Sequence, residues 1–157
     1  MKIIDLISRE VIETDLKSRE KEDMLEELVD LLVRGGAVSR NSKPQILDKL
    51  RERELLGSTG IGKGVAIPHA KCTRVKKMVA ALGVSEEGVD FSSLDGDLTY
   101  IFFILIAPGE TPGPHLKALA RISRLLDDKF VRERIRSAGS SREIFKIIKD
   151  EEQKSPK

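Results

Sequence analysis

The chain has 157 residues, of which 39% are hydrophobic and 34% charged, a composition typical of one globular domain with its own core. Its 28 basic and 26 acidic residues are intermixed, and aromatic residues are few, so neither a basic nucleic-acid surface nor a base-stacking platform is expected. A single cysteine excludes an internal disulfide, the N-terminus lacks a signal-peptide pattern, and no apolar run is long enough for membrane insertion, so we expect a cytoplasmic protein.

Two helices are predicted in the first third of the chain. Residues 17–36 have apolar side chains at helical spacing, with Ser18 as the expected cap and a Gly-Gly pair as the stop. A second helix is expected from about Pro44 to Leu55, with its isoleucine and leucines facing inward.

Short extended segments should follow these helices. Residues 65–67 are expected to be extended, because Pro68 disfavours the helical region for the residue before it. The near-continuous apolar runs at 78–84 and 100–107 are typical of strands covered on both faces. Residues 90–97, between these runs, are predicted to form a loop or a short strand with a turn.

The C-terminal third is predicted to be helical after a rigid Pro/Gly loop at residues 108–114. The last helix should begin at the capping box formed by Ser140 and Glu143. The expected helices cover residues 116–126, 130–136 and 142–151, and residues 153–157 are expected to form a frayed tail. Helices alternating with buried strands predict an α/β fold, a single-domain sandwich around one sheet.

The stretch GSTGIGKGVAIPHAK begins at Gly57 with the pattern GxxxxGK, one residue short of a phosphate-binding nucleotide loop. Such a loop connects a strand to a helix and ends in a Ser or Thr that binds Mg²⁺. Here a helix precedes the glycines, an extended segment follows them, and Gly64 comes after Lys63, so a nucleotide site is not expected. Two alternatives stay open: a mobile connection, or a backbone that passes close to a partner group or presents N–H groups to an anion.

The chain has only two histidines, and a rigid turn precedes each of them. His69 directly follows Pro68 at the end of the short extended segment, and His115 opens a helix and lies on its apolar stripe. A metal site is not expected, because the only third ligand nearby, Cys72, is not fixed on the same face by a regular element. A serine hydrolase is not expected either, since no GxSxG elbow is present.

The remaining chemistry for these histidines is nucleophilic attack on a phosphoryl group by a neutral imidazole. Such a reaction needs fixed donors and positive charge around the phosphoryl oxygens. Arg53 lies toward the inward face of its predicted helix, where its guanidinium could bind two such oxygens. A salt bridge from Arg53 to Glu54 or to a neighbouring helix is the alternative.

Two segments together resemble a known family. Residues 53–69, RELLGSTGIGKGVAIPH, and residues 114–126, PHLKALARISRLL, are similar to the signature of the mannitol/fructose-type enzyme IIA domain of the bacterial phosphoenolpyruvate-dependent phosphotransferase system. The likeness covers nearly the whole chain, from about Ile4 to Ile148.

The resemblance implies a mixed β-sheet flanked by helices on both faces and an enzyme IIA domain over residues 1–152. It implies a phosphotransferase component in which His69 accepts a phosphoryl group on Nε2 from the phosphocarrier HPr or its nitrogen-related paralogue. Arg53 and His115 match positions that line the phosphohistidine in that family, and no metal or cofactor is required. Ser58, Gly60 and Gly62 are weaker candidates for phosphate binding.

The resemblance leaves two physiological roles open. A free-standing domain with no membrane segment favours the nitrogen-regulatory branch, whose members bind regulatory partners. The alternative is an enzyme IIA subunit that passes phosphate to the IIB subunit of a fructose/mannitol-type sugar transporter, and a partner-binding protein that is never phosphorylated is a third possibility. Phosphorylation would place negative charge near a basic cluster, for which a solvated loop is the alternative explanation. The cluster comprises Lys63, Lys71, Arg74, Lys76 and Lys77.

Overall fold

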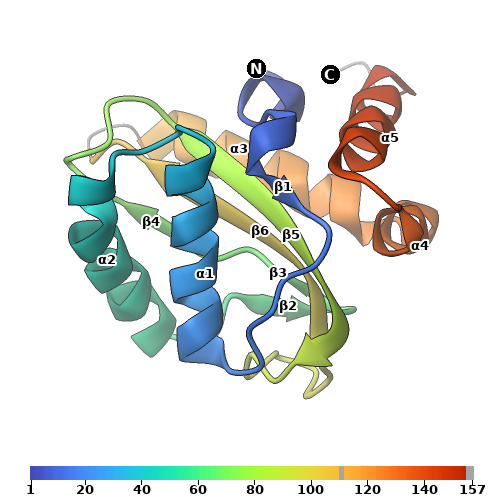
Figure 1. Cartoon of the computed structure of the whole chain (residues 1–157), viewed down its shortest axis with the longest axis horizontal. Helices are drawn as coiled ribbons and strands as arrows, with labels where there is room; N and C mark the ends of the chain where they lie inside the picture. The colour runs from blue at the N-terminus through green and yellow to red at the C-terminus, as the bar shows by residue number, and fades with distance from the viewer. Residues whose placement is uncertain (110–111, 155–157) are drawn as a thin grey trace.

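The computed structural model describes residues 1–109 and 112–154, which form an open mixed sheet between two groups of helices (Figure 1). Three short 3₁₀ turns lie at Ile3–Asp5, Arg9–Val11 and Arg40–Ser42. The strands are β1 (Ile12–Glu13), β2 (Gly60–Gly62), β3 (Val65–Ala66), β4 (His69–Lys71), β5 (Val79–Val89) and β6 (Thr99–Ala107). The α-helices are α1 (Lys21–Arg34), α2 (Lys43–Leu55), α3 (Pro112–Asp127), α4 (Lys129–Ser137) and α5 (Ser141–Lys154).

The sheet is built on β5 and β6, the two apolar runs of the sequence. They pair antiparallel, and nearly all of their side chains are buried because both faces of the sheet are covered. The strand order is β1-β5-β6-β3-β2, and β4 pairs with β6 beyond the end of β3. β1 is parallel to β5, while β3 and β4 are parallel to β6.

Helices cover the sheet on both sides (Figure 1). α1 and α2 lie over one face, where α1 contacts β5 and α2 contacts β4, and α3, α4 and α5 pack on the other. The buried side chains of all these elements join in one hydrophobic core. The predicted α/β sandwich with a mixed sheet and helices on both faces is therefore confirmed.

The predicted start of the first helix is wrong by four residues, and Ser18 does not cap it. The helix α1 begins at Lys21, because the carboxylate of Glu27 holds the preceding residues outside the helix. This carboxylate accepts the N–H of Lys17 at 2.9 Å, the N–H of Ser18 at 2.8 Å and the Ser18 hydroxyl at 2.7 Å. The hydroxyl that was expected to cap the helix is therefore bound to a side chain within the helix, nine residues further along the chain.

The C-terminal helices lie where they were predicted, with shifted ends. α3 begins at Pro112, so part of the expected loop 108–114 is helical, while residues 110 and 111 of that loop lie outside the described residues. The Ser140 hydroxyl accepts the Glu143 N–H at 3.1 Å, but the Glu143 carboxylate accepts from Gly139 instead of Ser140. α5 runs to Lys154, so the first two residues of the expected tail are helical and 155–157 lie outside the described residues.

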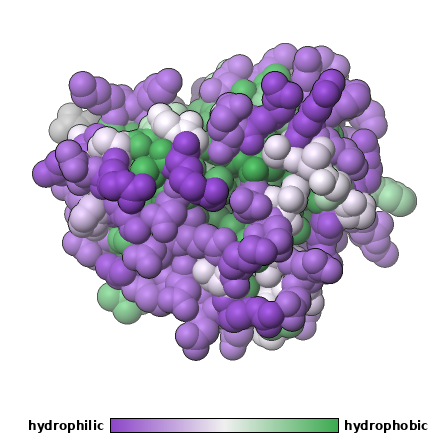
Figure 2. All heavy atoms as spheres, viewed as in Figure 1, coloured by the Kyte–Doolittle hydropathy of each residue, from purple (hydrophilic) through white to green (hydrophobic). Residues whose placement is uncertain are grey.

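The exterior is mostly hydrophilic, as Figure 2 shows for the face covered by α1 and α2. Exceptions include Leu55 and Leu56 at the end of α2, which are 87% and 84% exposed, and Leu116 near the start of α3, which is 66% exposed. Within residues 1–109 and 112–154, no helix has both the length and the apolar character that a membrane crossing requires. Of these leucines, Leu56 and Leu116 line the cavity of the candidate site.

Candidate functional site

His69 occupies the first position of β4, a strand that was not predicted as a separate element. We expected His69 at the end of a strand over residues 65–67, but β3 ends at Ala66 and Pro68 separates it from β4. The Pro68 carbonyl accepts the Leu105 N–H at 2.9 Å, and His69 then pairs in register with Leu105 of β6. The backbone on both sides of the imidazole is therefore fixed to a buried strand.

The hydrogen bond of the His69 ring defines its tautomer. Nδ1 lies 2.7 Å from the Ile67 carbonyl oxygen, and a carbonyl can only accept, so Nδ1 holds the proton in the neutral ring. The lone pair is then on Nε2. Burial lowers the pKa of His69 below its usual value, and the nearby positive charge of Arg53 lowers it further, against the opposing effect of the Ile67 hydrogen bond. At neutral pH the ring is thus held in the uncharged form with a nucleophilic Nε2.

His115 lies beside His69 in the first turns of α3. The two ring centroids are 5.4 Å apart with an interplanar angle of 88°, and His115 is only 5% exposed. Neither ring nitrogen of His115 has a hydrogen-bond partner among the described residues. Burial lowers the pKa of His115 to about 4, together with the electrostatic effects of His69 and of the Lys71 ammonium. The ring is therefore neutral at pH 7, with a buried donor and a buried acceptor left to pair with another group.

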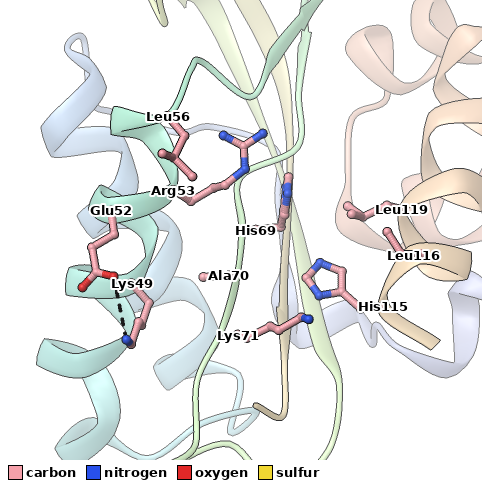
Figure 3. A pocket seen from close by; sticks show the side chains of 10 residues that line it. All are labelled: Lys49, Glu52, Arg53, Leu56, His69, Ala70, Lys71, His115, Leu116 and Leu119. Atoms are coloured by element: carbon pink, nitrogen blue, oxygen red, sulfur yellow. Dashed lines mark ion pairs between the residues drawn. The ribbon is translucent and has the colours of Figure 1, made fainter. Parts of the chain in front are cut away.

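Arg53 lies in the last turn of α2 and directs its guanidinium toward His69 (Figure 3). Its Nη1 donates to the Gly57 carbonyl at 2.9 Å, and it has no ion-pair partner in the described part of the chain. The alternative salt bridge to Glu54 is not formed. Glu54 pairs instead with Lys21 at 2.9 Å and accepts hydrogen bonds from the backbone N–H and the hydroxyl of Thr59. The remaining guanidinium N–H groups are thus available to an anion.

These three side chains line one cavity of about 610 Å³ between α2, β4 and α3. In Figure 3, Arg53 lies on one side of His69, and His115 and Lys71 lie on the other. The complete lining is Lys49, Glu52, Arg53, Leu56, His69, Ala70, Lys71, His115, Leu116 and Leu119. An anion bound at His69 would therefore have a guanidinium and a neutral imidazole within the same cavity.

Ser58, Gly60 and Gly62, the weaker candidates for phosphate binding, do not line this cavity. The Ser58 hydroxyl donates to the Phe91 carbonyl at 2.7 Å and accepts the Gly60 N–H at 3.0 Å. Gly60 and Gly62 belong to β2, which pairs antiparallel with β3. These residues build a hairpin at the edge of the sheet.

The glycines of this hairpin are required by its turn. Gly62, Lys63 and Gly64 have φ values of 100°, 59° and 77°, a left-handed run that glycine adopts without a steric penalty. Lys63 is held in this conformation by its N–H, which donates to the Asp95 carboxylate at 2.9 Å. The stretch follows a helix, runs through three short strands, and does not have the strand-to-helix geometry of a nucleotide loop.

Several cavity residues were not singled out from the sequence, although helical and strand spacing could have found them. Lys49 lies four residues before Arg53 and Leu56 three residues after it, which places them on one helical face. Glu52 lies three residues after Lys49 and four before Leu56. Lys71 follows His69 by two residues in β4, so both side chains point to the same side of the sheet. Once Arg53 and His69 are assigned to the site, the helical spacing of α2 and the two-residue alternation of β4 predict these further cavity residues.

Comparison with known proteins agrees with the predicted family and with the fold. A family model described as "Phosphoenolpyruvate-dependent sugar phosphotransferase system, EIIA 2" matches residues 5–151. The chain is 37% identical over 148 residues to the fructose-specific EIIABC component of the PTS system of Bacillus subtilis, covering 94% of the chain but 23% of that protein. It is 34% identical over 148 residues to the nitrogen regulatory protein of Bradyrhizobium diazoefficiens, covering 94% of the chain and 95% of that protein.

Solved structures give the same result. The nitrogen regulatory protein IIA-Ntr from Neisseria meningitidis has a TM-score of 0.85 and 32% identity, covering 93% of this chain and 98% of that one. The IIA mannitol structure from Escherichia coli has a TM-score of 0.77 and 26% identity, covering 90% and 98%. The chain therefore belongs to the EIIA 2 family of the phosphoenolpyruvate-dependent sugar phosphotransferase system.

Proposed function

We propose that this protein is a phosphocarrier that accepts a phosphoryl group from an HPr-type donor on Nε2 of His69. The supporting observation is the hydrogen bond from His69 Nδ1 to the Ile67 carbonyl, which leaves the lone pair on Nε2 inside a cavity lined by Arg53 and His115. Family membership supports phosphotransfer as the reaction class. A protein donor fits the exposed leucines at the cavity edge, which could pack against an apolar partner surface.

In the proposed step, the Nε2 lone pair attacks the phosphorus atom of a phosphohistidine on the donor. A new N–P bond forms at His69, the donor N–P bond breaks, and its electron pair returns to the donor ring. Nδ1 keeps its proton throughout, and the Ile67 carbonyl stabilises the positive charge that develops on the ring. Arg53 and the neutral His115 supply donors to the phosphoryl oxygens, and neither accepts the phosphoryl group.

The similar proteins suggest two physiological roles for this phosphocarrier, one in regulation and one in sugar transport. A role in regulation through partner binding follows the likeness to nitrogen regulatory proteins, and we favour it because one such relative is matched over 95% of its length. The alternative is phosphate transfer to the IIB subunit of a fructose/mannitol-type transporter, which follows the likeness to fructose-specific components. Both roles use the same phosphohistidine.

The first prediction concerns the acceptor. Incubation with phosphoenolpyruvate, enzyme I and HPr should add one acid-labile phosphoryl group per chain, and His69→Ala should add none, because no other nucleophile in the cavity has a comparable setting. Intact-mass spectrometry at alkaline pH measures the label. Labelling of His69→Ala at the wild-type level would show that the acceptor is a different residue.

A second prediction concerns the surrounding donors. Arg53→Ala and His115→Ala should still be labelled, but transfer from phospho-HPr should slow by about 10²- to 10³-fold, since one lost donor in such a site costs about 2.7–4 kcal/mol of barrier. Rapid-quench transfer kinetics measure this, with circular dichroism as the control for folding. Wild-type rates in both variants would contradict the proposed roles.

A further inference from the structure

One charged group in the cavity has no role in the function proposed above, namely the ammonium of Lys71. His69 and Lys71 are the first and third residues of β4, and Ala70 between them is buried on the opposite side. Two residues along a strand span about 6.6 Å, which is within the reach of a lysine side chain. In Figure 3 the Lys71 ammonium extends toward His115, on the side of His69 away from Arg53.

Lys71 lacks a competing carboxylate. In the described residues it forms no ion pair, and Glu52, the acidic residue of the cavity lining, lies 3.8 Å from Lys49. The residues that follow Lys71 toward β5 add the cations Arg74, Lys76 and Lys77 and no acidic group. The ammonium is thus exposed at the cavity without a negative partner in the described residues. The backbone of Lys71 is nevertheless fixed, because Lys71 pairs with Ala107 of β6.

A phosphoryl group on His69 would bring about 1.5 to 2 negative charges into this space. Arg53 can neutralise part of that charge from one side, whereas His115 is neutral and offers only a hydrogen bond. We propose that the Lys71 ammonium binds an oxygen of the phosphoryl group held by His69, from the side opposite Arg53, and is a catalytic residue of the transfer. This inference rests on the phosphocarrier function proposed above.

The electrostatics of the neighbouring histidine agree with this placement. The positive charge of Lys71 is among the causes that lower the pKa of His115, after burial and His69. Lys71 therefore has two effects in the cavity. It supplies positive charge to the phosphoryl oxygens, and it adds to the effect of burial, which keeps His115 uncharged with one protonated and one free ring nitrogen.

The test compares Lys71→Gln with Lys71→Arg and with a matched control, Lys76→Gln. Lys76→Gln removes the same charge from the same connection between β4 and β5, but Lys76 does not line the cavity. Single-turnover transfer from phospho-HPr is measured over a range of donor concentrations, which separates the maximum rate from the half-saturating concentration. The pKa of His115 in each unphosphorylated variant is measured by NMR titration.

Lys71→Gln should lower the maximum rate by about ten- to a hundredfold, which is less than for an enclosed donor because Lys71 is exposed. Lys71→Arg should restore most of the rate, since the charge is retained. Lys76→Gln should change only the half-saturating concentration and its salt dependence, as expected for a charge that steers docking. The pKa of His115 should rise in Lys71→Gln and stay unchanged in Lys76→Gln.

Two results would overturn the inference, and they are distinguishable. If wild-type protein is labelled and Lys71→Gln transfers at the wild-type maximum rate, Lys71 does not bind the phosphoryl group and the phosphocarrier function stands. If wild-type protein accepts no phosphoryl group from phospho-HPr, the proposed function and this inference fall together.

Discussion

At the scale of single residues, the two histidines whose pKa values are lowered should make the stability of the fold depend on pH. His115 is 5% exposed, and its pKa is lowered to about 4, mainly because burial disfavours the charged ring. In the unfolded chain the same ring would titrate near 6.5. As the pH falls, the unfolded state therefore binds a proton at a higher pH than the folded state does. The free energy of unfolding must then decrease below about pH 6.5.

We predict that the free energy of unfolding falls between pH 7 and pH 4, with His115 accounting for on the order of 3 kcal/mol. Urea unfolding at several pH values measures this. His115→Gln should lose that share of the pH dependence, while His69→Gln should lose a share of the same sign, because the pKa of His69 is also lowered. A His115→Gln variant with the wild-type pH dependence would contradict the burial argument.

At the scale of elements, a carboxylate on the last helix holds the first turn of the chain. Glu152 of α5 accepts the Ile3 N–H at 2.7 Å and the Ile4 N–H at 3.1 Å, and Arg121 of α3 lies 3.5 Å from it. Its side chain is only 6% exposed. Buried N–H groups at the start of a 3₁₀ turn need acceptors, and here the acceptor comes from the far end of the sequence.

Glu152→Ala should destabilise the fold by about 3 kcal/mol, because it leaves one buried and one partly buried N–H group without their charged acceptor. Gln153→Ala is the matched control on the same helix, and its exposed side chain should make the change nearly neutral. Chemical denaturation measures the difference, and hydrogen exchange at Ile3 and Ile4 should accelerate only in Glu152→Ala. Equal stability of the two variants would show that the cap is dispensable.

At the scale of the whole molecule, the proposed phosphorylation would change the net charge that a binding partner meets. The formal net charge is +2, and a phosphoryl group would nearly cancel it. The structure changes the predicted basic cluster in one respect, since Lys63 pairs with Asp127. Lys71, Arg74, Lys76 and Lys77 have no carboxylate partner in the described residues, and three of them lie on the connection between β4 and β5.

An acidic partner surface should therefore prefer the unphosphorylated form, and the preference should weaken as salt rises, because exposed charges are screened over about 8 Å at physiological ionic strength. Capture of proteins from the source lysate by both forms, at low and moderate salt, measures this. A double variant, Lys76→Gln with Lys77→Gln, should weaken capture by the unphosphorylated form. Identical partner sets for the two forms would favour the transport alternative over the regulatory role.

Helices and strands that leave a pattern in neighbouring residues could be predicted from the sequence alone. The apolar runs of β5 and β6, the helix α2 and the three C-terminal helices follow from periodicity, because burial on two faces or on one stripe leaves a pattern in neighbouring residues. It also selected His69, Arg53 and His115 together, through a long motif and the rigid turns before both histidines. The family assignment rested on the same motif and is confirmed.

Features that depend on partners distant in the sequence could not be predicted from it. Glu27 shifted the start of α1 away from Ser18, β6 made His69 the start of its own strand, and Asp95 fixed the hairpin turn at Lys63. The place of Lys71 in the cavity wall likewise required α2, β4 and α3 to meet. A hydrogen bond or a cavity between elements leaves no periodic trace in the chain, so it becomes visible only when those elements are packed.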